Sequence, residues 1–146
     1  MVITVIGVIL LGSGCMLSPS TLRVPAAALD SVRGIGKVEA EISIENERNN
    51  SIQIENLLVI DVKASSDREA LDKAVNFLSD RNWRITGENR PVIVSLESTD
   101  WQNTNLTLRP FNPMYFEDHP NVLETLKKAS IKEESLVYLE VFEGEI

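Results

Sequence analysis

His119 is the only histidine of the chain, and it directly follows two carboxylates, Glu117 and Asp118. Imidazole and carboxylate groups together could bind a metal ion or transfer protons. Three successive side chains cannot all reach one ion without a contorted backbone, and the chain has one cysteine and no second histidine to complete a ligand set. Pro120, the next residue, indicates the start of a helix. We therefore expect no metal site and no cofactor.

Nucleophilic chemistry and carboxylate chemistry receive no clearer support from the spacing of residues. Ser95, Ser98 and Ser135 lie in no recognisable nucleophile elbow, and His119 would be the sole imidazole base. Hydrolysis by a carboxylate pair needs two acids about 5–10 Å apart in a cleft. The 22 acidic residues do not single out such a pair. The sequence favours a binding or assembly domain that is not an enzyme, and a hydrolase that uses acidic residues is the alternative.

Three aromatic side chains are candidates for contact with a ligand or a partner. Trp101 lies in a polar loop at residues 98–103, and Tyr115 and Phe116 lie in an irregular segment with three prolines at residues 110–120. Aromatic side chains suit interfaces, but they are more often buried. The competing interpretation is that Trp101 anchors its loop to the sheet and that residues 111–116 are fastened to the core.

The first fifteen residues form the most distinctive segment. Val2 to Leu11 is apolar except for Thr4, and the small residues at 12–14 lead to Cys15, the only cysteine. As a helix, an apolar run of this length would rise about 15 Å, which is half the thickness of a bilayer core of about 30 Å. The run instead has the length of the apolar region of a signal peptide, and small residues suit the cleavage site.

This pattern resembles the signal peptide of bacterial lipoproteins, in which the cysteine carries a diacylglycerol. The family usually has leucine three residues before the cysteine, where this chain has Gly12, and no Lys or Arg precedes Cys15. The resemblance implies a signal peptide at residues 1–14 and lipidation of Cys15 with fatty acids such as palmitate. It implies a protein anchored in the cell membrane, facing outside the cytoplasm, with an envelope protein as a candidate partner. The alternative enzyme would then be an envelope hydrolase.

Other interpretations of the leader stay open at this point. A plain secretory signal without lipidation fits the same apolar run. The β-branched residues could instead form a buried strand of a cytosolic α+β domain. Residues 12–14 could also belong to a phosphate loop, but Leu17 stands where a dinucleotide loop needs glycine, and the residues after it do not open a helix.

Charge and cysteine usage exclude some classes of partner and chemistry. The net charge is −8, and no charged residue precedes Cys15. A nucleic-acid partner would require a basic face, so the acidic balance argues against one. If Cys15 is lipidated, no thiol is left for a disulfide, a nucleophile or a metal site.

The rest of the chain divides into a tether and one domain. Residues 15–36 contain Pro19, Pro25, Gly34 and Gly36 and lack sustained periodicity, which is typical of a tether. Residues 37–146 are numerous enough for a single α+β domain with its own core.

Hydrophobic periodicity predicts the elements of this domain. Strands are expected at 37–47, 51–63, 83–88, 92–97, 106–109 and 136–142, and helices at 66–80 and 121–130. Ser66 and Glu69 predict a capping box at the start of the first helix. We predict an α+β fold of order β-β-α-β-β-β-α-β, in which two helices cover one face of a mostly antiparallel sheet. The β-α-β-β-α-β order within it is that of a ferredoxin-like sandwich.

Overall fold

The computed structural model describes residues 20–48, 50–129 and 131–144. These residues form one seven-stranded sheet, three α-helices and two short 3-10 helices. In chain order the elements are β1 (Ser20–Leu22), α3 (Ala26–Arg33), β2 (Lys37–Arg48), β3 (Ser51–Asp61), α4 (Asp67–Ser79), β4 (Trp83–Asn89), β5 (Ile93–Ser98), β6 (Thr104–Pro110), η2 (Pro113–Phe116), α5 (Pro120–Lys128), η3 (Glu133–Ser135) and β7 (Leu136–Glu143). None of the helices in these ranges is long and apolar enough to cross a membrane.

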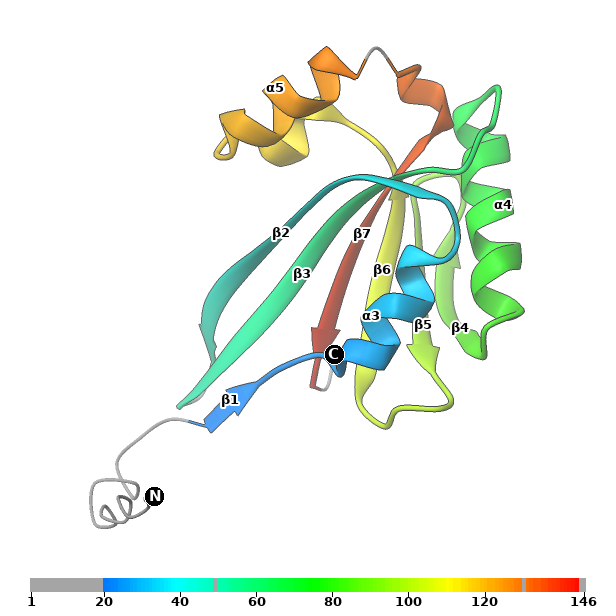
Figure 1. Cartoon of the computed structure of the whole chain (residues 1–146). Coiled ribbons are helices and arrows are strands. Elements are labelled where there is room, and N and C mark those ends of the chain that lie inside the picture. Colours follow the sequence, from blue (N-terminus) through cyan, green and yellow to red (C-terminus); the bar gives the residue numbers. More distant parts are fainter. Residues whose placement is uncertain (1–19, 49, 130, 145–146) are drawn as a thin grey trace, which may run out of the picture.

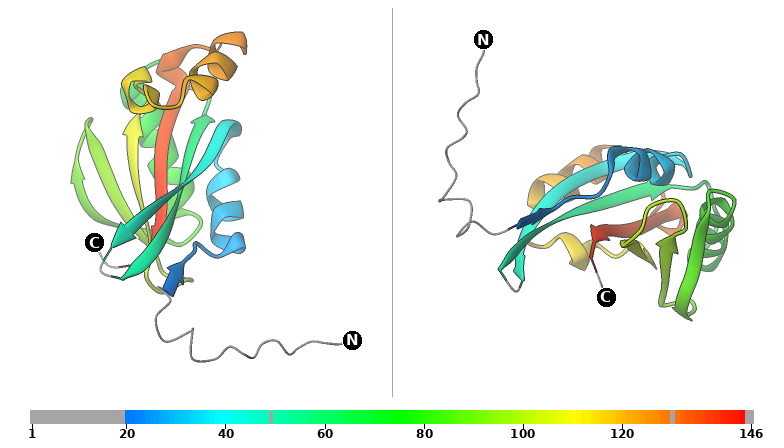
Figure 2. Two further views of the ribbon diagram at one scale, coloured as in Figure 1. Left: turned by 90° about the vertical axis from the view of Figure 1, so that its left-hand side faces the viewer. Right: turned by 90° about the horizontal axis from the view of Figure 1, so that it is seen from below.

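The sheet confirms the predicted α+β class and the mostly antiparallel pairing. Its strands follow the order β1-β3-β7-β6-β5-β4, and β2 pairs with β3. Among the described strands, only β1 pairs in parallel, with the first residues of β3. The last strand, β7, lies between β3 and β6, so residues from both ends of the described chain share one sheet (Figure 1). The sheet twists from β2 to β4 (Figure 2).

One face of the sheet packs beneath α3 and α4, and we call it the α3/α4 face. Leu58 of β3, Leu106 of β6 and Leu139 of β7 point to this face and have no exposed surface. The predicted helix at 66–80 is α4, and its apolar stripe lies on these strands. The buried residues of α4 are Ala70, Leu71, Ala74, Val75 and Leu78.

The opposite face of the sheet is partly covered by α5 and η2, and we call it the α5 face. Leu57 and Val59, which alternate with the residues of the first core, pack here with Phe116 of η2 and with Val122 and Leu126 of α5. The expectation of two helices on one face is therefore wrong, because α5 covers the other face. Helices on both faces, and three strands between α4 and α5, also distinguish the fold from a ferredoxin-like sandwich.

The expected tether at 15–36 is folded from Ser20 onward. Ala28 and Val32 of α3 have no exposed surface and belong to the core of the α3/α4 face. Arg33, at the end of α3, donates from Nε and Nη2 to the two carboxylate oxygens of Glu41 on β2, at 2.9 and 2.6 Å. Such a two-bond pair fixes both distance and orientation. Residues 20–36 are thus part of the domain, whose boundary was predicted at 37.

The alternation of β2 was predicted correctly only in part. Val38, Ala40, Ile42 and Ile44 were expected on one face. A β-bulge between Val38 and Ala40 shifts the register, so Val38 packs with the α3/α4 face while the other three pack with the α5 face. One extra residue in a strand moves every following side chain to the other face.

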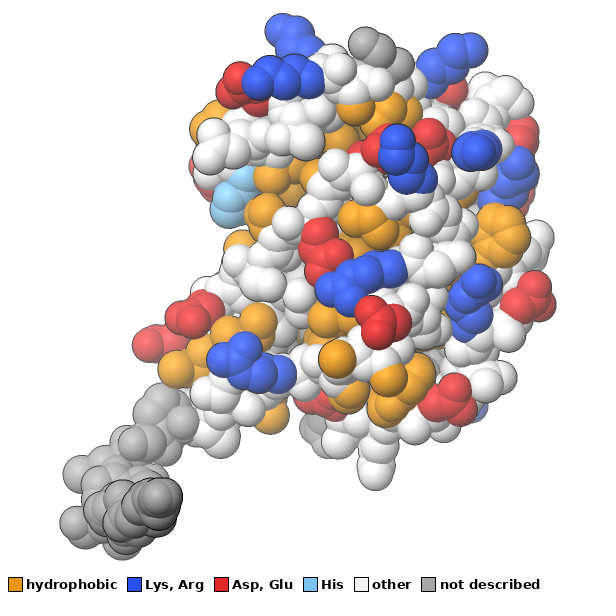
Figure 3. Space-filling view, viewed as in Figure 1, with side chains coloured by type: hydrophobic (Ala, Val, Ile, Leu, Met, Phe, Trp, Pro, Cys, Tyr) orange, Lys and Arg blue, Asp and Glu red, His pale blue; other side chains and the backbone are white. Residues whose placement is uncertain are grey.

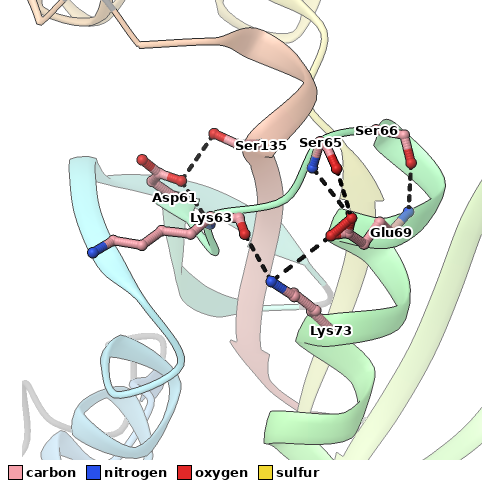
Figure 4. A network of polar contacts seen from close by, with 7 residues as sticks. All are labelled: Asp61, Lys63, Ser65, Ser66, Glu69, Lys73 and Ser135. Carbon is pink, nitrogen blue, oxygen red and sulfur yellow. Dashed lines mark hydrogen bonds and ion pairs between the residues drawn. The ribbon is translucent and has the colours of Figure 1, made fainter.

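Polar contacts hold the loop that leads from β3 into α4 (Figure 4). The Oγ of Ser66 accepts a hydrogen bond from the Glu69 amide at 3.1 Å, which confirms Ser66 as the N-cap. The Glu69 carboxylate does not close the predicted box on Ser66; it accepts from the Ser65 hydroxyl at 2.8 Å. Lys73, one turn further along, donates to the Lys63 carbonyl at 2.7 Å. The start of α4 is therefore fixed by Ser65 and Ser66, which precede the helix, together with Glu69 and Lys73 within it.

Replacing Ser66 with alanine is expected to lower the free energy of unfolding by about 1 kcal/mol, because one amide of the first turn of α4 loses its acceptor. Urea unfolding measures the change. Ser79→Ala, at the exposed end of the same helix, is the matched control. Equal effects of the two substitutions would contradict the capping role.

Candidate functional site

The centre of the α5 face carries a group of polar side chains. Thr107 and Arg109 of β6 lie directly opposite Glu140 and Tyr138 of β7 in the antiparallel register. Leu57 of β3 pairs with Glu140 from the other side, so Glu55, two residues before it, is a diagonal neighbour of Glu140 on the same face. We call Glu55, Thr107, Arg109, Tyr138 and Glu140 the polar cluster.

Burial changes the electrostatics of the polar cluster. It raises the pKa of Glu140 above its ordinary value, and the positive charge of Arg109 opposes this shift while the negative charge of Glu55 adds to it. Burial also raises the pKa of Tyr138, and the neighbouring Glu140 contributes to that shift. In both groups, burial removes the side chain from water and disfavours its charged form. Perturbed pKa values of this kind are common at functional sites.

Two polar atoms of the polar cluster are buried without a hydrogen-bond partner in the described structure, Thr107 Oγ1 and Arg109 Nε. Arg109 also makes no ion pair within 4 Å among the residues that the structure describes. Buried polar groups are normally satisfied, and an unsatisfied one is costly. The α5 face therefore holds hydrogen-bonding capacity that the domain itself does not use.

Tyr115, a predicted contact residue, lies beside this polar cluster. Its ring stacks on Tyr138 with a centroid distance of 4.9 Å and an angle of 25° between the planes. The guanidinium carbon of Arg109 lies 5.7 Å from the centre of the Tyr115 ring, within the range of a cation–π contact. Tyr115 is half-buried, so it links the 3-10 helix η2 to the polar cluster and still presents surface to a partner.

The other two aromatic candidates do not join Tyr115. Phe116 is only 1% exposed and packs in the core beneath α5, with its ring 5.2 Å from that of Tyr138, so its prediction as a contact residue is wrong. Trp101 is half-buried and packs against the core of the opposite, α3/α4 face. This agrees with the competing interpretation of Trp101 as a loop anchor. The three residues therefore do not form one site.

His119 lies at the N-cap of α5, where Pro120 opens the helix as expected. The centroid of its ring lies 6.5 Å from the centroid of the Phe116 ring. Within residues 20–48, 50–129 and 131–144, no three histidine, cysteine or acidic side chains are grouped so that they could hold a metal ion. Cys15, the predicted lipidation site, lies outside the described residues.

The polar cluster, with Tyr115 beside it, is the part of the described surface with the most unusual chemistry. No known protein family, curated protein or solved structure matches this chain. The interpretation of the site therefore depends on its own residues. Arg109, without an ion pair in the described part of the chain, and the half-buried Tyr115 are suited to bind polar groups of a partner.

Sequence reasoning identified Tyr115 but missed the polar cluster. The alternation of Thr107 and Arg109 with leucines predicts a strand, but it does not indicate which residues lie beside its polar side chains. Only the placement of β7 between β3 and β6 brings Glu140 to Thr107 and Glu55. A weak signal was present, because Glu140 interrupts a run of mostly apolar residues in β7.

Glu140→Gln is expected to make the protein more stable at pH 7 and to change its pH dependence. The folded state raises the pKa of Glu140, so it holds this proton more tightly than the unfolded chain does. That contribution to stability is complete below the unfolded pKa of about 4.3 and is lost as the pH rises through the folded pKa. Glutamine resembles the protonated form and avoids this loss.

Thermal unfolding between pH 4 and pH 7 measures the effect. The difference in Tm between Glu140→Gln and the unaltered chain should grow with pH. Glu134→Gln, the same substitution at an exposed position, is the control. A constant difference for Glu140→Gln would contradict the buried character of this carboxyl.

Proposed function

We propose that this protein is a lipoprotein, anchored in a membrane by lipids on Cys15, whose domain binds or assembles with another envelope protein outside the cytoplasm. The observation that carries the proposal is the leader, in which an apolar run at residues 2–11 and three small residues precede the only cysteine. Two or more acyl chains on that cysteine would hold the protein on a membrane stably, whereas one chain would not.

The fold is compatible with such an anchor. Within the described residues, both core clusters lie between Val24 and Val141. Five residue steps separate Cys15 from Ser20, and they span at most about 18 Å. Because β1 lies at the opposite end of the domain from α5 (Figure 1), an anchored domain would keep its β1 end near the membrane and extend α5 away from it.

The partner surface in this proposal is the α5 face around Tyr115. Arg109 is half-buried and makes no ion pair within 4 Å in the described part of the chain, so it favours a partner with acidic groups. The net charge of −8 argues against nucleic acid.

Intact-mass analysis of protein purified from the membrane fraction tests the anchor. The expected mass corresponds to a chain that begins at Cys15 and carries a diacylglyceryl group and an N-linked acyl chain. A chain that begins at an unmodified Cys15, or one that retains Met1, would refute the proposal.

One observation favours a second candidate, an envelope hydrolase. Glu140, with its raised pKa, and Glu55 lie on the same face of the sheet, and a general acid needs such a shift. Purified protein incubated with cell-wall glycan would then release reducing sugars, and both Glu140→Gln and Glu55→Gln would abolish the release. If the unaltered protein releases no reducing sugars, this activity is excluded.

A further inference from the structure

A largely apolar cavity of about 400 Å³ opens between α5, the segment that leads into η2, and the start of β7. Its volume is within the range of small-molecule sites, about 300–1,000 Å³. Phe111, Leu126 and Leu136 belong to the core of the α5 face, so the cavity continues that core to the surface. The apolar walls are formed by Phe111, Pro113, Leu123, Leu126, Ile131 and Leu136.

Two charged side chains, Lys127 and Glu133, complete the lining of the cavity. Leu123, Leu126 and Lys127 lie on one strip of α5, because residues three and four apart share a helix face. Lys127 is exposed and lines the cavity next to these two leucines. Basic side chains gather at this end of the molecule above hydrophobic ones (Figure 3).

Lys127 differs from its neighbour Lys128 in one respect. Lys128 pairs with Glu124 across one turn of α5 at 3.3 Å, whereas Lys127 makes no ion pair within 4 Å in the described part of the chain. Its charge is therefore available to an anionic group. An occupant of the cavity would place an apolar body against the leucines and an anionic end at Lys127.

We infer that this cavity binds a single-chain amphiphile with a carboxylate head, of the fatty-acid class. The chain would lie on Leu123, Leu126 and Leu136, and the carboxylate would accept hydrogen bonds from Lys127. Glu133, at the same cavity, weakens the affinity for a carboxylate by charge repulsion. The site does not depend on Cys15, so it can be tested whether or not the protein is anchored.

The test uses the full chain in an amphipathic polymer and a fatty acid that carries a diazirine near its methyl end. After illumination, peptide mass spectrometry should locate adducts on α5 and on residues 131–136. Unlabelled saturated fatty acids should compete, with about fourfold tighter binding per added methylene until the cavity is filled. Adducts scattered over the surface, or equal competition at every chain length, would overturn the inference.

Variants separate the apolar contribution from the charge. Leu123→Trp fills the cavity and should abolish site-specific labelling, with circular dichroism to verify the fold. Lys127→Gln should weaken competition by the fatty acid about fivefold and leave the corresponding alcohol unchanged, as an exposed ion pair predicts. Lys128→Gln should leave competition by the fatty acid and by the alcohol unchanged. Glu133→Gln should make the fatty acid bind more tightly. If Leu123→Trp abolishes the labelling but Lys127→Gln does not weaken competition by the fatty acid, the carboxylate assignment is wrong. The cavity would then be an apolar site for a partner side chain.

Discussion

Replacing Cys15 with alanine is expected to abolish the incorporation of radiolabelled palmitate into this protein and to release it from membranes washed at alkaline pH. The sulfur of Cys15 is the only thiol in the chain, so no other residue can take a thioether-linked diacylglycerol. Without acyl chains, the buried hydrocarbon that holds the domain on the bilayer, about 0.8 kcal/mol per methylene, is lost. Fluorography and fractionation of cells that express each variant measure both effects.

Ser18→Ala is the matched control for this substitution, because it lies three residues after Cys15 and leaves the sulfur in place. It should keep both the label and the membrane fraction. Equal labelling of the Cys15→Ala variant would exclude lipidation at this residue.

A chain that starts at Met16 distinguishes the anchor from a folded N-terminal strand. The lipoprotein proposal expects this shortened chain to be soluble and to unfold cooperatively, because a signal peptide is removed from the mature protein and is no part of its fold. An insoluble or unfolded product would favour the interpretation of residues 2–11 as a buried strand of a cytosolic domain.

Phe116→Ala is expected to lower the free energy of unfolding by about 3–5 kcal/mol, which is the usual cost of truncating a buried phenylalanine. Phe116 is 1% exposed. The centroid of its ring lies 6.2 Å from that of Phe111 and 5.2 Å from that of Tyr138. Its loss would leave a cavity in the core that positions α5 and Tyr115. Urea unfolding of the chain that starts at Met16 gives the change.

Met114→Ala provides the comparison, because Met114 lies in the same 3-10 helix and is 67% exposed. It should change the free energy of unfolding by less than about 0.5 kcal/mol. If Phe116→Ala were equally mild, Phe116 would regain its earlier role as a candidate contact residue.

The elements that sequence reasoning predicted well are those whose signal is local. The alternation from Leu136 to Phe142 became β7, and the stripe that begins at Ala70, with Ser66 before it, became α4 with its N-cap. Periodicity and capping involve residues within a few positions of each other, so a single sequence contains all the information they need.

The short helix α3 shows where local signals end. It has eight residues, follows Pro25 and has no side-chain cap. A helix of this length is marginal in isolation, because a few hydrogen bonds do not compensate for nucleation. Its stability comes from packing on the α3/α4 face and from the Arg33–Glu41 pair, both of which require residues outside the helix.

The α+β class and the order of helices and strands from residue 37 onward could be predicted from the sequence alone, because each element carries its own local pattern. Three features required the three-dimensional structure: α5 covers the opposite face from α4, Phe116 is interior, and Arg109 and Glu140 lie on the same face as Tyr115. Periodicity shows which side of an element is apolar, whereas strand order and register across the whole chain set what packs against each side.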